Sequence, residues 1–295
     1  MNRETLAAID IGSNAIRLQI SYIEESGSKV EFKRAVFVRV PIRLGEDVFT
    51  SGSIGEEKRE KMSEAMASFA ALMKTFNVRA YRACATSAMR EAANGKEILE
   101  DISARNGIDI EIISGREEAE TIFEAGDIAG LMDSDHTYLY IDVGGGSTEI
   151  TVYANRQMVF SESFPIGTVR MLSGAVGKEE LRVFKAWLEK EALPYAPVAI
   201  IGSGGNINKI QRLLGKKDRE LLRHVELRLL YEQLKEMTYE QRMKNMGMKD
   251  YRADVILPAL KIFISAGRAC HIDKIIVPRL GLADGIINQL YRKGK

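Results

Sequence analysis

Residues 8–14 read Ala-Ile-Asp-Ile-Gly-Ser-Asn, and residues 141–147 read Ile-Asp-Val-Gly-Gly-Gly-Ser. Each segment is an apolar run with one aspartate that reaches glycine, continues into small polar residues and then enters a second apolar run. The two aspartates, Asp10 and Asp142, lie 132 residues apart (142 − 10). This offset is the size of a domain and is too long for a solenoid repeat. The repeat therefore predicts two similar α/β domains that face each other across a cleft.

Hydrophobic periodicity around these segments predicts alternating strands and helices. Three successive strands are expected in each half of the chain, at 6–11, 16–24 and 30–40 and again at 137–143, 149–153 and 158–164. Amphipathic helices are expected at 56–75, with Ser53 as the N-cap, and at 226–246, with a break at Thr238. We predict a first domain over residues 1–122 and a second over residues 123–295, and we leave open whether the helix 283–295 packs back on the first.

Composition narrows the class of protein. The 295 residues carry a net charge of +1, which argues against a general nucleic-acid or membrane-surface protein. Two cysteines and three histidines are too few for a disulfide framework or a histidine-rich metal centre. There is no signal-peptide pattern and no apolar run of about 20 residues, so we expect a cytoplasmic protein.

The two glycine-rich turns are typical of phosphate-binding loops. Glycine lets backbone N–H groups converge on an anion without a Cβ clash, and Ser13, Asn14, Ser147 and Thr148 add side-chain donors. An aspartate just before each glycine would repel phosphate directly. It makes sense if a Mg²⁺ ion lies between carboxylate and phosphate, or if the carboxylate holds a water. The alternative is a pair of tight β-turns with aspartate as a turn former.

Further segments occur in the order found in one known family. Together with residues 10–18 and 142–149, the sequence resembles the exopolyphosphatase / guanosine pentaphosphate phosphatase family, in its short two-domain class. The matching segments are Ala85-Thr86-Ser87-Ala88-Met89-Arg90-Glu91-Ala92-Ala93-Asn94, Ile113-Ser114-Gly115-Arg116-Glu117-Glu118-Ala119, Ile166-Gly167-Thr168-Val169-Arg170 and Gly202-Ser203-Gly204-Gly205-Asn206. The resemblance covers about residues 8–285.

The resemblance implies an α/β fold of two actin-like ATPase (ribonuclease H-like) domains across an inter-domain cleft. It implies hydrolysis of a phosphoanhydride, either release of terminal phosphate from inorganic polyphosphate or conversion of guanosine pentaphosphate (pppGpp) to ppGpp. The sequence does not separate these substrates. The alternative is a catalytically weak sensor of (p)ppGpp or polyphosphate. An actin-like ATPase or a sugar kinase is less favoured, because the Glu-Glu-Ala and Ala-Thr-Ser-Ala segments are not their signatures. A homodimer is also consistent with the resemblance.

The resemblance also assigns site residues. The catalytic set is Glu118, Asp142, Glu149 and Asp10, with Glu118 as the base that orients the attacking water and Asp10 and Asp142 as ligands of Mg²⁺ or another divalent cation. Glu149 either helps the metal or is satisfied by nearby donors. The phosphate-binding set is Gly12, Ser13, Asn14, Arg17, Thr86, Ser87, Arg90, Gly144, Gly145, Gly146, Ser147 and Thr148. Gly204, Gly205 and Asn206 are expected in a supporting or substrate-contacting role.

The sequence departs from the family near its end. The family's Arg-Glu-Gly triplet corresponds here to Ala283-Asp284-Gly285, so its arginine is absent, and Arg279 is a candidate substitute. The departure concerns distal substrate contacts more than the chemistry. Basic residues after the glycine-rich turn at 202–205 could line a channel for a long polyanion, although a solvated face is the favoured interpretation. They are Lys209, Arg212, Lys216, Lys217, Arg219 and Arg223.

Overall fold

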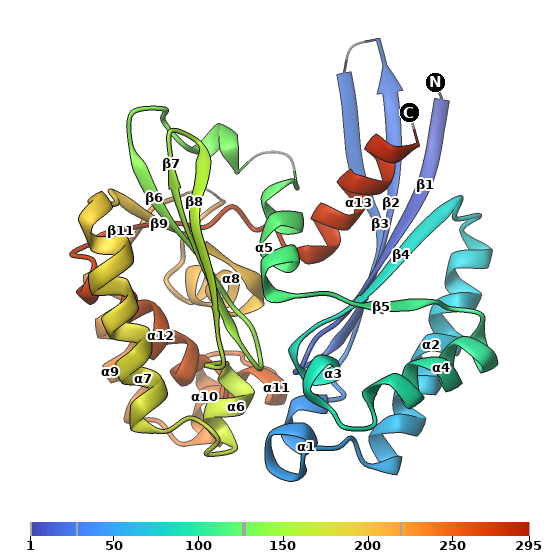
Figure 1. Cartoon of the computed structure of the whole chain (residues 1–295), viewed down its shortest axis with the longest axis horizontal. Coiled ribbons are helices and arrows are strands. Elements are labelled where there is room, and N and C mark those ends of the chain that lie inside the picture. The colour runs from blue at the N-terminus through green and yellow to red at the C-terminus, as the bar shows by residue number, and fades with distance from the viewer. Residues whose placement is uncertain (1, 28, 126–127, 219, 295) are drawn as a thin grey trace. The chain divides into compact units, whose positions relative to one another are not determined.

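The computed structural model describes residues 2–27, 29–125, 128–218 and 220–294. The chain divides into two compact units (Figure 1). Unit 1 contains residues Met1–Gly126 and Leu282–Lys295, and unit 2 contains residues Asp127–Gly281. Each unit has its own hydrophobic core, in which buried aliphatic side chains from the central strands meet those of the covering helices. Each unit is described separately below.

Unit 1 is built on a five-stranded sheet with the strand order β3-β2-β1-β4-β5. Strands β1, β2 and β3 form an antiparallel meander, and β4 and β5 continue the sheet in parallel with β1. The strands are β1 Asn2–Ile11, β2 Ile16–Ser26, β3 Lys29–Val40, β4 Ala80–Ala85 and β5 Ile110–Ile112. The carboxyl ends of β1, β4 and β5 therefore lie at one edge of the sheet, which is where ligands bind in open α/β folds.

The helices of unit 1 follow the apolar stripes of the sequence. They are α1 Leu44–Ser51, α2 Glu56–Thr75, α3 Ser87–Glu91, α4 Gly95–Asn106, α5 Gly115–Phe123 and α13 Leu282–Lys293. In α2 the buried face includes Met62, Met66 and Phe69. The prediction of Ser53 as the N-cap is wrong, because α2 begins at Glu56 and Gly55 occupies the cap position without a side-chain cap.

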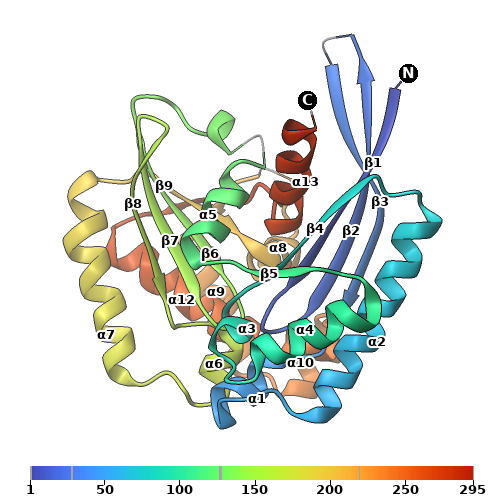
Figure 2. The same cartoon turned by 45° about the vertical axis from the view of Figure 1, so that its right-hand side comes forward.

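The last helix, α13, packs on β1 and α5 inside unit 1 (Figure 2). Gly285 permits this contact, since a Cβ there would lie closer than 3.0 Å to the backbone of Thr121 on α5. Asp284 accepts hydrogen bonds from Gln19 at 2.9 Å and Arg34 at 3.1 Å. The sequence expectation ended the first domain at residue 122 and left the place of the final helix open. In the structure, the compact unit runs on to 126 and includes the final helix.

Unit 2 is built on a six-stranded sheet with the strand order β10-β11-β9-β6-β7-β8. Again three antiparallel strands lie side by side, and β9 and β11 extend the sheet in parallel with β6. The strands are β6 Thr137–Val143, β7 Thr148–Ala154, β8 Gln157–Phe164, β9 Ala199–Ser203, β10 Leu222–Arg223 and β11 Lys274–Ile276. This arrangement repeats the β3-β2-β1-β4-β5 order of unit 1 as β8-β7-β6-β9-β11.

The helices of unit 2 lie in the connections from β8 to β9, from β9 to β10 and from β10 to β11. They are α6 Thr168–Leu172, α7 Lys178–Trp187, α8 Gly204–Leu213, α9 His224–Lys235, α10 Tyr239–Asn245, α11 Asp250–Ala253 and α12 Ile256–Ala269. Short helical turns lie at Ala129–Leu131, Leu188–Ala192 and Leu193–Tyr195. The break predicted at Thr238 is confirmed, because its hydroxyl accepts from Gln241 N and caps α10.

The internal repeat extends to the strand register. In unit 1 Asp10 pairs across the sheet with Arg17, and in unit 2 Asp142 pairs with Glu149. The turns close alike, since Gly12 N donates to Ala15 O at 3.1 Å and Gly144 N donates to Ser147 O at 3.0 Å. The 132-residue offset holds for every residue of both hairpin turns. The predicted α/β class and its repeated domains are therefore confirmed within each unit.

Candidate functional site

In the first glycine-rich loop, at the carboxyl end of β1, the carbonyl groups accept hydrogen bonds from backbone N–H groups at the start of α1. Ser13 O accepts from Gly45 N at 2.9 Å, and Asn14 O accepts from Arg43 N at 3.2 Å. Within the described residues, the N–H groups of Ser13 and Asn14 donate to no protein acceptor. Ser13 Oγ and Asn14 Oδ1 are also buried there without a hydrogen-bond partner. Buried polar groups are rarely left unpaired, so this cluster indicates the place of a ligand or water.

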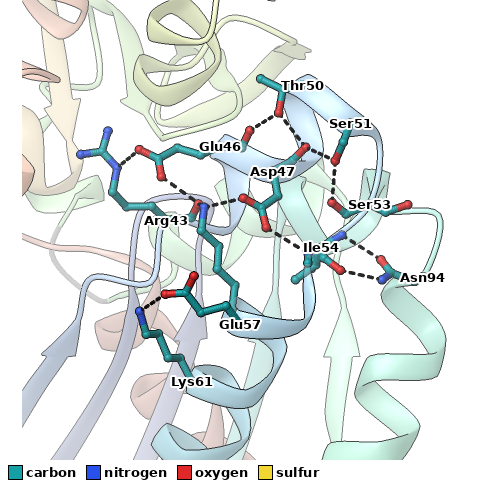
Figure 3. A network of polar contacts seen from close by, with 12 residues as sticks. Arg43, Glu46, Asp47, Thr50, Ser51, Ser53, Ile54, Glu57, Lys61 and Asn94 are labelled. Atoms are coloured by element: carbon teal, nitrogen blue, oxygen red, sulfur yellow. Dashed lines mark hydrogen bonds and ion pairs between the residues drawn. The ribbon is translucent and has the colours of Figure 1, made fainter.

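A polar network holds the start of α1, where Arg43 N and Gly45 N donate to the first loop (Figure 3). Asp47 on α1 accepts from Gly55 N at 2.9 Å and forms an ion pair with Lys58 of α2 at 2.7 Å. The Asn94 side chain closes two hydrogen bonds with the Ile54 backbone, at 3.0 and 2.8 Å. These bonds fix the start of α2 against α1, and thereby fix the N–H groups that reach the first loop.

Asp10 and Arg17 form an ion pair beside this loop. Both side chains lie 3.7 Å from the position that a Gly12 Cβ would occupy. Arg17 is thus placed next to the loop, as predicted for a phosphate contact. Asp10 is bound to a guanidinium group in this structure, and the metal-binding role that the resemblance implies for it stays a prediction.

The ends of β4 and β5 add the other predicted residues of unit 1. Thr86 donates its N–H and its hydroxyl to Ile11 O, the carbonyl just before Gly12. The Ser87 hydroxyl donates to Glu91 at 2.8 Å. Arg90 donates to Ile113 O at 2.7 Å and so fixes the chain where α5 begins. The carboxyl edge of the sheet therefore brings the first loop, α3 and the start of α5 together.

The two adjacent glutamates of α5 have different surroundings. Glu117 forms an ion pair with Arg82 at 2.7 Å, and Arg82 also binds Glu111. Arg82 lowers the pKa of the Glu111 carboxyl by hydrogen bonding. Ser114 caps the helix by accepting from Glu117 N at 3.1 Å. Glu118 is half-buried in the same first turn. Glu117 thus serves the packing of unit 1, which is consistent with the choice of Glu118 as the base.

In the second glycine-rich loop, at the end of β6, the carbonyl groups likewise accept hydrogen bonds from the helix that follows, here α6. Thr168 N donates to Gly144 O at 3.0 Å, and Val169 N donates to Gly145 O at 2.8 Å. Arg170 Nε donates to Gly146 O at 2.7 Å, and this side chain is buried. Within the described part of the chain, the N–H groups of Gly145 and Gly146 donate to no protein acceptor. In both loops, therefore, carbonyl groups are hydrogen-bonded to a later helix, and N–H groups remain available to a ligand.

Close packing explains the glycine that precedes α6. A Cβ on Gly167 would lie closer than 3.0 Å to backbone atoms of Gly145 and Gly146. Gly167 and Arg170 were recognised in the sequence as part of a matching segment, but no role was assigned to them. The available signal was the Gly-Thr-Val-Arg segment itself, which stands at the start of a helix. In the structure this segment contacts a loop more than 20 residues earlier in the chain.

Two predicted donors of the second loop are already used within unit 2. The Ser147 hydroxyl donates to Glu149 Oε1 at 2.6 Å. Thr148 has no exposed surface, and its hydroxyl donates to Ile166 O. Both hydroxyls therefore have protein acceptors in this structure, and their binding to phosphate stays a prediction. The Ser147 acceptor lies only two residues along the chain, whereas the Thr148 acceptor comes from the chain after β8.

Asp142 and Glu149 are two buried carboxylates directly opposite each other on β6 and β7. Glu149 Oε1 accepts from Ser147 and also from Ser163 at 3.0 Å. Asp142 lies against the start of α8, where a Cβ on Gly204 would lie closer than 3.0 Å to its carboxylate. The N-terminus of a helix carries partial positive charge, and here it lies beside this carboxylate.

The predicted turn at 204–206 supports this carboxylate. Gly204 has φ +90°, a conformation that glycine adopts readily. Asn206 donates to Val143 O at 3.1 Å and accepts from Arg252 at 2.8 Å. Gly205 lies against the Arg252 guanidinium, which sequence reasoning did not select. The turn therefore links α8 and α11 to the residue just before the second loop.

Arg279, the candidate substitute for the missing family arginine, and the basic residues after the turn at 202–205 have local contacts. Arg279 binds Gln211 at 2.9 Å and forms an ion pair with Asp218, so within unit 2 it is directed at α8 and the chain that follows. Lys216 pairs with Glu226 at 3.1 Å. Burial, together with the nearby charges of Arg212 and Arg252, lowers the pKa of Lys209. Arg219 lies outside the described residues.

Within the described residues, no group of three or more histidine, cysteine, aspartate or glutamate side chains is placed to hold a metal ion. None of the helices described is both long enough and apolar enough to cross a membrane.

Known proteins resemble this chain over nearly all of its length. "Exopolyphosphatase 1" of Mycobacterium tuberculosis is 24% identical, over 96% of this chain and 87% of the relative. A guanosine-5'-triphosphate,3'-diphosphate pyrophosphatase of Aeromonas salmonicida is 26% identical over 97% of this chain. The chain spans only 59% of the length of that second relative.

A solved structure and a family model also match this chain. The structure of the Ppx/GppA family member from Aquifex aeolicus matches with a TM-score of 0.78 and 27% identity, over 100% of this chain and 99% of that one. The model of the Ppx/GppA phosphatase family matches residues 36–293. Since that match covers most of the sequence and both domains, the chain belongs to the Ppx/GppA phosphatase family.

Proposed function

We propose that the chain hydrolyses the terminal phosphoanhydride of a polyphosphorylated substrate, either inorganic polyphosphate or pppGpp. The observation that carries the proposal is the matched construction of the two loops. Each has its carbonyls bound by a following helix and its N–H groups without protein acceptors among the described residues. Outward N–H groups on a glycine turn form an anion-binding concavity. The family membership and the names of the relatives support the same chemistry.

The first loop is proposed to bind the phosphoryl group that is cleaved. The N–H groups of Ser13 and Asn14 and the orphaned Ser13 hydroxyl supply neutral donors. Arg17 supplies a guanidinium group, which suits phosphoryl oxygens and offsets charge in the transition state. The ion pair with Asp10 restricts the orientation of Arg17. In this proposal Asp10 therefore positions the arginine, in place of the metal-binding role that the resemblance implied.

Glu118 is proposed as the group that orients the attacking water. Phosphoanhydride hydrolysis has a loose transition state, so placing the water in line matters more than strong basicity. The capped first turn of α5 and the bond from Arg90 to Ile113 O fix the backbone from which Glu118 extends.

A divalent cation fits Asp142 and Glu149. Their Cβ atoms lie within about 5.5 Å as a cross-strand pair, and like charges in such pairs destabilise a sheet unless they are compensated. Mg²⁺ prefers oxygen ligands and takes one or two carboxylates together with substrate phosphates. When bound, it would neutralise charge on the phosphoryl oxygens. The serine bonds to Glu149 Oε1 fix that carboxylate in place beside Asp142.

Phosphate release from long-chain polyphosphate and from pppGpp, measured in parallel, tests the proposal. Glu118→Gln should lower kcat by about 10²-fold or more, as loss of a positioned general base does. Glu117→Gln is the matched control: it makes the same change one residue away, at a part-buried ion pair with Arg82. Equal rates for the two variants would refute the role of Glu118. Substrate binding without release by the wild type would favour the sensor alternative.

The metal assignment has its own test. Mn²⁺ binding, followed by calorimetry or electron paramagnetic resonance, should weaken by about tenfold or more in Asp142→Asn and Glu149→Gln. Asp10→Asn should leave Mn²⁺ affinity unchanged, because Asp10 pairs with Arg17. Loss of affinity in Asp10→Asn alone would return the metal to the first loop. The expected homodimer and cytoplasmic location stay predictions.

A further inference from the structure

A cavity of about 490 Å³ opens on unit 2, outside the glycine-rich loops and the turn at 204–206. We call it the α9–α12 groove. Its lining residues come from α9 and α12, with one from α7. These three helices lie on the same side of unit 2 (Figures 1 and 2). Its lining residues are Lys185, Val225, Arg228, Leu229, Tyr231, Glu232, Lys261, Ile264, Ser265 and Arg268.

Helical spacing explains how two helices form this surface. On α9 the residues at 225, 228, 229 and 232 follow the i, i+3, i+4, i+7 pattern of one helix face, and on α12 the residues at 261, 264, 265 and 268 do the same. α9 and α12 pack against each other. On α9, Leu229 is 68% exposed and Val225 is 51% exposed, whereas Tyr231 and Ile264 are partly buried against the core. The groove thus has two apolar side chains open to solvent, one helical turn apart, beside the partly buried Tyr231 and Ile264.

Positive charge predominates among the residues that line the groove. Four cationic side chains line it and one carboxylate, Glu232, whereas the whole chain has a net charge of only +1. Lys185 pairs with Glu189 at 3.3 Å and Glu232 lies 3.9 Å from Lys235, whereas no ion pair among the described residues joins Arg228 or Arg268 to a carboxylate. Lys261 lies over the Tyr231 ring, 5.9 Å from its centroid. Cations gathered in a concave surface attract anions and raise their local concentration.

We propose that the α9–α12 groove binds a nucleoside that carries several phosphates. Arg228 and Arg268 present guanidinium forks, which match phosphoryl oxygens, and Lys185 and Lys261 add point charges. Tyr231, Leu229 and Val225 offer an aromatic and aliphatic surface for a base. A volume of about 490 Å³ lies in the range of small-molecule sites, which are mostly apolar with a few convergent polar groups.

Other occupants match these features less well. An inorganic polyphosphate would satisfy the cations but would leave the exposed apolar side chains in water. A second copy of the chain would place the same cationic patch against itself in a two-fold contact, because such a contact is formed by one surface on both subunits. An acidic helix would need a longer groove than two turns. The test below distinguishes a nucleotide from an inorganic chain.

The experiment is isothermal titration of the intact chain with GTP, ATP and inorganic tripolyphosphate, in a Glu118→Gln background that prevents turnover. The double variant Arg228→Ala/Arg268→Ala should lose one equivalent of bound nucleotide, or bind it at least about tenfold more weakly. The control Arg182→Ala/Arg223→Ala removes the same charge from exposed ion pairs elsewhere on unit 2 and should keep that binding. Leu229→Ser should weaken GTP and ATP but not tripolyphosphate.

Two results would overturn the proposal. The first is unchanged nucleotide stoichiometry and affinity in the double variant. The second is tripolyphosphate binding in the groove as tightly as GTP and ATP, with no effect of Leu229→Ser, which would make it a plain polyanion site. In an otherwise wild-type chain the double variant should release phosphate at the normal rate in the absence of nucleotide. That result separates the groove from the catalytic loops.

Discussion

Adding one methyl group at Gly167 should disable catalysis without removing any chemical group. The alanine Cβ would lie closer than 3.0 Å to backbone atoms of Gly145 and Gly146, and backbone cannot rotate away as a side-chain tip can. Ordinary contact begins near 3.4 Å, so the second loop must move by about 0.5–1 Å from the place where α6 holds it. A misplacement of about 1 Å can lower a rate by about 10²-fold, or roughly 2.7 kcal/mol of transition-state stabilisation.

The assay is steady-state phosphate release by Gly167→Ala, with kcat and KM determined separately. Overpacking also costs about 1–3 kcal/mol of stability, so thermal unfolding must show that the variant is folded at the assay temperature. Gly281→Ala is the control, because it adds the same methyl group to unit 2 where no atom lies within 4 Å. A folded Gly167→Ala enzyme with the kcat of the control would refute the view that α6 positions the second loop for catalysis.

Three further predictions follow from the packing and the charges. Gly285→Ala should lower the free energy of unfolding by about 1–3 kcal/mol, measured by urea denaturation, because its Cβ would overlap the Thr121 backbone; an unchanged midpoint would contradict the contact between α13 and α5. Cys84 and Cys270 should resist iodoacetamide at pH 8 until the protein is unfolded, because burial raises the pKa of both thiols to about 12 and keeps them protonated below that pH; rapid labelling of the native protein, followed by mass spectrometry, would show that the thiols are accessible. Arg170→Lys should lower kcat by about tenfold or more while thermal unfolding shifts little, since lysine keeps the charge but loses the fixed Nε bond to Gly146 O; full activity of this variant would remove Arg170 from loop positioning.

The sequence determined the features that depend on short segments. A strand that carries an aspartate and ends in glycine and small polar residues predicts a turn of N–H groups, whatever surrounds it. Two such segments at a domain-sized offset predicted the repeated α/β units, and the structure repeats them down to the pairs Asp10–Arg17 and Asp142–Glu149. Short segments in a fixed order also predicted the family, which the match of the family model to residues 36–293 shows.

The tertiary structure decided which atoms of those segments remain available to a ligand. The donors that bind the loop carbonyls come from Gly45 and Arg170, far along the chain, and no local pattern encodes that contact. For the same reason the sequence did not indicate that the Thr148 hydroxyl meets a carbonyl from another strand connection. It also left the place of α13 open, because packing against Thr121 depends on the assembled unit. Local sequence sets backbone conformation, whereas hydrogen-bond partners depend on how distant segments pack.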